Sequence, residues 1–146
     1  MAEPFRDPEA ALRFIQAGNA RLTLRSTRTQ TRYTFRVREA EASPNDPRPA
    51  FFVSLLKGRD NNADYSYIGM AKGDKFFTTK ATRHMENAAF VKAFSYMYRW
   101  LTQRRALPPE VEVWHESRCG RCGRPLTVPH SIATGIGPEC ARHTRD

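Results

Sequence analysis

The chain has 146 residues, of which 40% are hydrophobic and 27% are charged. This length and composition predict one globular domain with a buried core and exclude wholesale disorder. Lysine and arginine outnumber aspartate and glutamate by 24 to 15, so the formal net charge is +9 and the isoelectric point is about 10. Such a charge favours a polyanionic partner. Nucleic acid is the first candidate, with an acidic protein partner and simple solubility as the alternatives.

The sequence carries no membrane or secretion signal. No apolar run approaches the roughly 20 residues that a membrane-spanning helix needs. The N-terminal residues MAEPFRDPEA include acids and prolines, whereas a signal peptide has a basic and then an apolar stretch. We therefore expect a cytoplasmic protein with no membrane partner.

The first predicted element is a short helix that begins at Asp7-Pro8-Glu9. Aspartate can cap a helix, proline fits its first position, and glutamate is favourable in its first turn. Four apolar residues then follow at helical spacing: Ala11, Leu12, Phe14 and Ile15. Gly18 comes next and is typical of a helix end.

Two segments of alternating polar and apolar residues, 21–25 and 32–38, predict a β-hairpin. One face of it is apolar, and the other carries two threonines and five arginines: Arg21, Arg25, Arg32, Arg36 and Arg38. No acidic residue alternates with these arginines, so a polyanion would suit the surface. The alternative is the solvated outer face of an antiparallel sheet. Tyr33 and Phe35 point away from the arginines, so this strand provides no aromatic platform for bases.

Further strands and a long helix follow the hairpin. Residues 51–56 predict a strand buried on both faces, and residues 65–70 and 75–80 predict two more strands. Asn87 is a candidate cap for a helix from Ala88 to Arg105. Its apolar stripe should lie across the sheet: Phe90, Ala93, Phe94, Met97, Tyr98 and Leu101. Residues 111–114 predict a last short strand.

These elements predict an α+β fold in which an antiparallel sheet of about five strands is covered by one long helix. We expect residues 1–110 to form this body, with its short N-terminal helix, meander and long helix. Residues 111–146 should form a zinc-knuckle tail, similar to a treble clef, that packs on the body.

All three cysteines lie near the C-terminus, as Cys119, Cys122 and Cys140, and His143 follows the last of them. The spacing C-x2-C-x17-C-x2-H brings four ligands to one tetrahedral Zn²⁺. An odd number of cysteines argues against a disulfide framework. A glycine after each of the first two cysteines lets backbone amides approach the sulfurs. The sequence therefore predicts one structural zinc ion held by Cys119, Cys122, Cys140 and His143.

The fourth zinc ligand has alternatives. His115 lies four residues before Cys119, at the end of the last predicted strand, and His130 lies between the two halves of the motif. A histidine near a metal can also hydrogen-bond to a ligand without binding the metal itself. The spacing favours His143 and leaves His115 as the main alternative.

Motifs of catalytic chemistry are missing from the sequence. A catalytic zinc site keeps a position open for water and usually has a carboxylate nearby. Glu139 adjoins Cys140, but the motif order of the zinc deaminases is reversed here and their C-x-x-C after the glutamate is missing. The sequence also has no Ser/His/Asp set, phosphate loop or dinucleotide fingerprint. We expect a protein that is not an enzyme.

The stretch CGRCGRPLTVPHSIATGIGPEC, from Cys119 to Cys140, resembles a short module of unknown function found in phage, prophage and plasmid proteins. That module has the pattern C-x2-C-G-R-x-L-T-x-P-x-S-I-x-x-G-x-G-P-x-C. The segments AGNARLTL, TRYTFRV and YSYIGM are similar to the longer mobile-element proteins that end in it. The resemblance implies a mobile-element origin, a zinc-binding tail and, for a phage protein, the host cytoplasm. It also favours His115 as a ligand, because those relatives more often have a histidine before the first cysteine.

Together these observations predict a non-enzymatic nucleic-acid-binding accessory protein of a phage or mobile element. The residues expected to contact phosphates are the five hairpin arginines together with Arg118, Arg121 and Arg124 around the knuckle. The alternative is a protein-interaction module or inhibitor that docks its basic face on a host defence or transcription complex. The sequence does not fix the oligomeric state.

Overall fold

A computed structural model describes residues 4–41, 44–46, 48–59, 63–115, 119–122 and 134–136. In these residues the chain forms two α-helices, one 3-10 turn and six strands. Their bounds are α1 (Pro8–Ile15), β1 (Asn19–Ser26), β2 (Arg32–Glu39), β3 (Ala50–Leu56), β4 (Tyr65–Lys72), β5 (Lys75–Phe77), η1 (Arg83–Met85), α2 (Ala89–Thr102) and β6 (Val111–His115).

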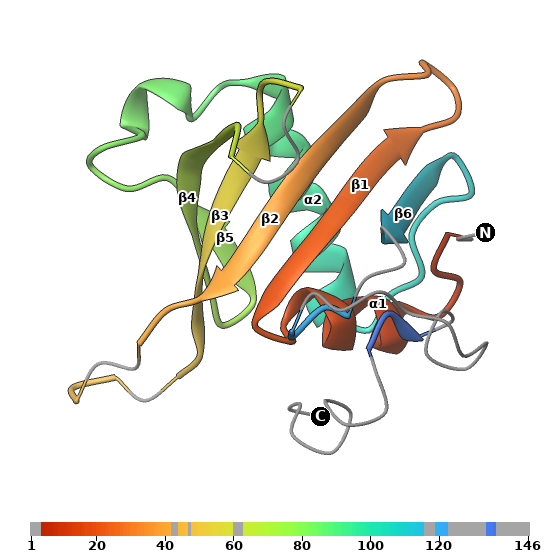
Figure 1. Cartoon of the computed structure of the whole chain (residues 1–146). Coiled ribbons are helices and arrows are strands. Elements are labelled where there is room, and N and C mark those ends of the chain that lie inside the picture. The colour runs from red at the N-terminus through yellow and green to blue at the C-terminus, as the bar shows by residue number, and fades with distance from the viewer. Residues whose placement is uncertain are drawn as a thin grey trace.

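The strands form one antiparallel sheet in the order β5-β4-β3-β2-β1-β6. The meander runs from β1 to β5, and the chain then returns through α2 to place β6 on the free edge of β1 (Figure 1). This confirms the predicted α+β class and the helix-covered antiparallel sheet. The predicted last strand is the sixth member of that sheet, so the segment that leads to the cysteines begins inside the body.

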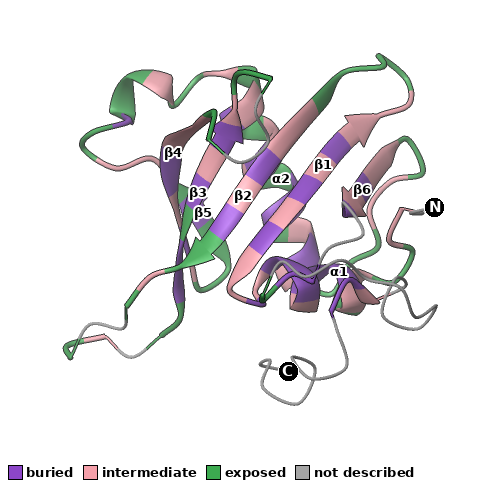
Figure 2. Ribbon diagram, viewed as in Figure 1, coloured by how far each residue is buried: buried purple, intermediate pink, exposed green. Residues whose placement is uncertain are grey.

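Buried and more exposed residues alternate along the strands because the helices cover only one face of the sheet. In β1 the buried residues are Ala20, Leu22 and Leu24, and in β2 they are Phe35 and Val37. Figure 2 shows this as alternating buried and intermediate bands along both strands. Tyr33 packs against the same core, as the sequence predicts.

The prediction that residues 51–56 are buried on both faces is wrong. Phe51, Val53 and Leu55 of β3 are buried, whereas Phe52 between them is 44% exposed. An unbroken apolar run fits both a strand buried on two faces and a strand buried on one. The pattern alone therefore does not show that the helices cover only one face of the sheet.

The helix α2 crosses behind the sheet and supplies the centre of the core (Figure 1). Phe94 is fully buried, and its ring centroid lies 5.0 Å from that of Phe35 and 4.9 Å from that of Phe76. The predicted cap is wrong: Ala88 occupies the N-cap position and makes no side-chain cap hydrogen bond. The 3-10 turn η1 delivers the chain to α2 instead.

The short helix α1 begins as predicted, since the amide of Glu9 donates a hydrogen bond of 3.1 Å to Asp7 Oδ1. It packs on the same side of the sheet as α2, and its residues Phe14 and Ile15 are almost fully buried. Among the described residues, no helix has the length and apolar character required to span a bilayer.

Candidate nucleic-acid interface and metal centre

The sheet face opposite the helices is called the open face here. The open face carries the strand residues that lie between the buried ones, and no helix of the described ranges covers this face (Figure 1). All five hairpin arginines of β1 and β2 are brought together on this face, where they are half-buried or exposed. The sequence predicted this cluster correctly.

The strand register places like charges opposite one another. Arg21 pairs with Arg36, Arg25 pairs with Arg32, and Asn19 pairs with Arg38. Between the two arginine pairs, the hydroxyl oxygens of Thr23 and Thr34 form a hydrogen bond of 2.9 Å. Like charges directly opposite on antiparallel strands destabilise a sheet by a few tenths to about 1 kcal/mol per pair. The open face therefore concentrates positive charge at a cost in folding stability.

Burial and neighbouring charge act together on Arg36. Desolvation lowers the pKa of its guanidinium most, the charges of Arg38 and Arg21 lower it further, and Tyr65 acts in the opposite direction. The Arg36 guanidinium carbon lies 4.6 Å from the Tyr65 ring centroid, in a cation-π arrangement. The Nε atoms of Arg25 and Arg36 are buried and have no hydrogen-bond partner within the described part of the chain. Each of these two guanidinium groups therefore has one donor enclosed in the protein surface and not directed to solvent.

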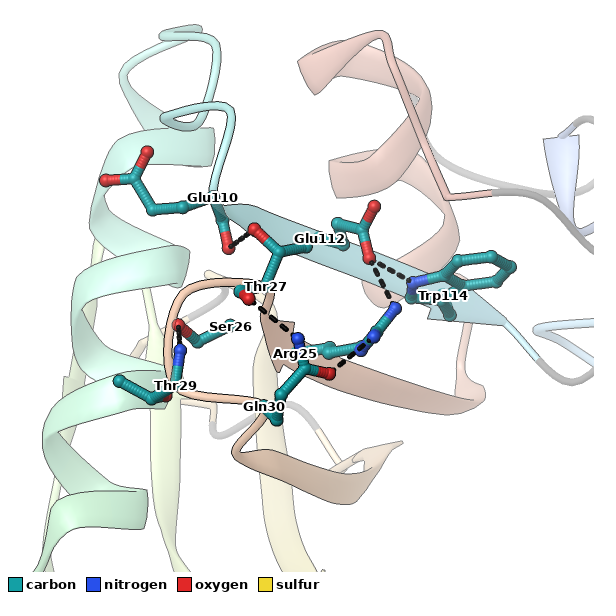
Figure 3. A network of polar contacts seen from close by, with 8 residues as sticks. All are labelled: Arg25, Ser26, Thr27, Thr29, Gln30, Glu110, Glu112 and Trp114. Atoms are coloured by element: carbon teal, nitrogen blue, oxygen red, sulfur yellow. Dashed lines mark hydrogen bonds and ion pairs between the residues drawn. The ribbon is translucent and has the colours of Figure 1, made fainter.

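One carboxylate faces the arginines from the edge strand β6. Glu112 Oε1 lies 3.3 Å from Arg25 Nη1 and accepts a hydrogen bond of 3.2 Å from Trp114 Nε1 (Figure 3). Arg25 Nη2 donates a second hydrogen bond, of 2.7 Å, to Gln30 Oε1 in the β1–β2 turn. Among the strand residues described on the open face, Glu112 alone supplies a negative charge, against the five arginines of β1 and β2.

The open face also carries aromatic residues that sequence reasoning missed. Phe52 of β3 and Tyr67 of β4 meet edge to face with ring centroids 5.9 Å apart. Trp114 pairs with Thr23 at the other edge of the hairpin. The alternation Tyr65-x-Tyr67 in the sequence is a signal for one of these rings, since residues two apart on a strand share a face, whereas the lack of an aromatic platform predicted for β2 applies to that strand alone.

The first cysteine pair lies where the tail meets α1. Cys119 is 1% exposed, and the Arg121 amide donates a hydrogen bond of 3.4 Å to its sulfur. Cys122 is exposed, and neither cysteine forms a disulfide. Amide hydrogen bonds to sulfur stabilise a thiolate, so this half of the motif has the donor chemistry that a zinc ion needs.

Phe14 of α1 is the anchor on which these tail segments dock. A Cβ on Gly120 would lie 2.7 Å from Phe14 Cδ1, and a Cβ on Gly135 would also overlap the ring. The Gly120 amide donates to the Gly135 carbonyl at 2.7 Å, and the Asn19 amide donates to the Gly120 carbonyl at 2.8 Å. Glycine at both positions therefore allows the backbone to close around an aromatic ring and joins the tail to the start of β1.

His115 belongs to the same cluster. It is 4% exposed at the end of β6, and its ring centroid lies 5.4 Å from that of Phe5 and 5.6 Å from that of Phe14. Its backbone neighbour across the sheet is Leu22. The candidate ligand His115 and Gly120, the residue after the first cysteine, thus both lie against Phe14 of α1.

The remaining predicted site residues divide into two groups. Arg121 is exposed, and its Cγ would lie 3.9 Å from a Cβ on Gly18, next to the start of β1. The others lie outside the described residues: Arg118, Arg124, His130, Cys140 and His143. Within the described ranges, no three histidine, cysteine or acidic side chains form a group that could hold a metal.

Comparison with known proteins reaches only the C-terminal part of the chain. Residues 112–145 match the model of a family of unknown function (DUF6011). The match begins within β6, so it includes the edge strand of the sheet as well as the cysteine segment. It agrees with the resemblance of residues 119–140 to a module of unknown function. No curated protein and no solved structure matches the chain.

Proposed function

We propose that the chain binds nucleic acid through the arginines of the open face and has no enzymatic activity. The observation that carries this proposal is the register that sets Arg21 opposite Arg36 and Arg25 opposite Arg32, with Glu112 as the nearby carboxylate. A sheet gains nothing in stability from such pairs. Guanidinium groups bind phosphates with two parallel hydrogen bonds, so a phosphate backbone would offset the repulsion between the paired arginines.

The tail has a structural part in this proposal. One zinc ion would be held by Cys119, Cys122, Cys140 and a histidine, with His143 favoured by spacing and His115 as the alternative. The buried Cys119 and the Arg121 amide on its sulfur support the proposal. Zinc would close the tail against Phe14 and so hold Arg121 beside the start of β1.

The biological setting is part of the same proposal. The resemblance of residues 119–140 to modules of phage and plasmid proteins supports a mobile-element accessory protein that acts in the host cytoplasm. The alternative role, as an inhibitor that docks on a host protein complex, gains support from the exposed Phe52 and Phe77.

A pair of exposed arginines on the open face provides the test. Arg32→Gln with Arg38→Gln removes two positive charges there, and Lys92→Gln with Arg99→Gln removes two exposed charges from α2 on the other side. Binding to labelled oligonucleotides is measured by fluorescence anisotropy from about 50 to 200 mM salt. The open-face pair should weaken binding and reduce the slope of log K against log salt by about 1.4 for single strands and about 1.8 for duplex.

The α2 pair should leave both the affinity and the salt slope close to those of the unaltered protein. Absence of binding to single-stranded and duplex oligonucleotides at the lowest salt would overturn the proposed function. Equal losses from the two variant pairs would also overturn it, because binding would then follow net charge and not the open face.

A further inference from the structure

We infer that the open face binds single-stranded nucleic acid, with phosphates along the arginines and bases over an aromatic patch on β3, β4 and β5. The aromatic patch is Phe52, Tyr67 and Phe77. This inference rests on the proposed function and adds the class of ligand to it. It is carried by the register of the sheet and by the exposure of the two phenylalanines.

The register continues the arginine rows into the patch. Arg38 pairs with Phe52, Phe52 pairs with Met70, and Met70 pairs with Phe77, so one row crosses the sheet from a cation to two phenylalanines. In the next row Arg36 pairs with Ser54, and Ser54 pairs with Tyr67. Because neighbouring strands lie about 4.8 Å apart, the patch begins one strand from the arginines of β2 and ends about 14 Å from them.

These rings have no role in the core. Phe52 is 44% exposed and Phe77 is 43% exposed, while their sequence neighbours Phe51 and Phe76 fill the buried face. Phe52 and Tyr67 instead contact each other on the solvent side of the sheet. Clustered exposed aromatic residues mark surfaces that bind a partner, and their place beside five arginines indicates a partner with both negative charge and flat apolar groups.

A single strand has that combination, whereas a duplex does not. In a duplex the bases are stacked on each other, and their flat faces are not accessible to protein rings. Proteins that bind single strands pair a positive groove for the backbone with aromatic side chains for the bases. From Arg32 to Arg38 the strand β2 covers about 20 Å, so a backbone that follows it would direct successive bases over β3 and β4.

Three ligands of equal length separate the contributions of charge and bases. The first is an oligothymidylate of about 15 nucleotides, within the range of site sizes of single-strand binding folds. The second is its duplex with oligoadenylate, and the third is an abasic sugar-phosphate chain. The oligothymidylate should bind at least about fivefold more tightly than the abasic chain, which is the effect of stacking one base. It should also bind more tightly than the duplex.

Phe52→Leu provides the matching change in the protein, and Tyr96→Leu is its control. Tyr96 is also 44% exposed but lies on α2. Phe52→Leu should weaken oligothymidylate binding about fivefold or more and leave the salt slope unchanged, because it removes a ring and no charge. Tyr96→Leu should change neither quantity. Thermal melting of both variants verifies that they are folded.

The outcomes distinguish this inference from the proposed function. If none of the three ligands binds, the proposed function fails. If the abasic chain or the duplex binds as tightly as oligothymidylate, or if Phe52→Leu has no effect, nucleic-acid binding stands but the inference is overturned. In that case the aromatic patch would be assigned to a protein partner.

Discussion

Gly120 shows how strongly a single position constrains the junction between tail and body. A methyl group there would lie 2.7 Å from Phe14 Cδ1 and 3.0 Å from the Phe14 carbonyl oxygen. Gly120→Ala should therefore lower the free energy of unfolding by about 1–3 kcal/mol, as measured by urea denaturation, because the ring must shift within a packed site.

The partner of that change is Phe14→Leu, which replaces the rigid ring by a smaller side chain and removes Cε1, the ring atom 2.9 Å from the new methyl group. In a double-mutant cycle the cost of Gly120→Ala should fall by at least about 0.5 kcal/mol when leucine occupies position 14. Additive effects would mean that the ring is not what excludes a side chain from position 120.

Tyr98 should make the free energy of unfolding depend on pH in the alkaline range. Its side chain is fully buried, its hydroxyl accepts a hydrogen bond of 2.9 Å from Gln16 Nε2, and burial raises its pKa above the usual 10. The folded state holds this proton more tightly than the unfolded state. The resulting stabilisation is complete below pH 10 and is lost as pH rises from about 10 towards the higher folded-state pKa.

Tyr98→Phe tests that linkage. The variant should lose about 1 kcal/mol at neutral pH, because Gln16 loses its acceptor. Between pH 9 and 11, values that bracket the free tyrosine pKa of about 10, its unfolding free energy should fall less steeply than that of the unaltered protein in parallel urea titrations. Parallel curves over this range would exclude Tyr98 as the source of the alkaline loss.

At the scale of elements, the sequence predicted those that have a clear period and a clear boundary. The hairpin of β1 and β2 follows from strict alternation, and α1 follows from its Asp-Pro-Glu start. The exposure of Phe52 could not be predicted, because its apolar segment shows no alternation that would assign each residue to a face. The pairing of β6 with β1 did not follow either, because contacts between strands nearly 90 residues apart depend on the whole topology.

The same limit explains what was predicted of the open face. Its arginines could be assigned to one face because they lie on consecutive strands. Its aromatic residues come from β3, β4, β5 and β6, and only the strand order brings them beside the arginines. The zinc-ligand set remains a prediction from spacing, of which the described residues include Cys119, Cys122 and the alternative His115.

The edge strand β6 should tune the affinity of the open face through Glu112. Glu112→Gln keeps an oxygen acceptor for Trp114 Nε1 but removes the charge beside Arg25. Nucleic-acid affinity should rise, and the salt slope for single strands should steepen by about 0.7, since one more cation becomes available to phosphate. Stability should change by less than about 1 kcal/mol, because both partners are partly exposed to solvent.

Glu86→Gln is the matched control for this charge change, because Glu86 is exposed and follows η1, away from the arginine pairs. It should leave the salt slope unchanged. Weaker binding by Glu112→Gln would contradict the assignment of Arg25 to the phosphate-binding surface.

At the scale of the whole molecule, zinc should determine whether the tail stays docked on the body. The body has its own core between the sheet and α2, whereas the described tail segments contact α1 through Phe14 and two glycines. We therefore expect about one zinc ion per chain by elemental analysis, and Cys122→Ser should reduce that content. Zinc binding of about 10–16 kcal/mol, as in zinc-finger peptides, is large enough to control such a docking equilibrium.

Hydrogen exchange with and without a chelator locates the effect. The amides of Gly120 and Asn19, which donate to the carbonyls of Gly135 and Gly120, should lose protection when zinc is removed. Amides in the centre of β2 and β3 should stay protected, because their partners belong to the body. A metal-free protein in which Gly120 keeps its protection would show that packing on Phe14 alone fixes the tail, and that no metal is required to hold Arg121 beside the start of β1.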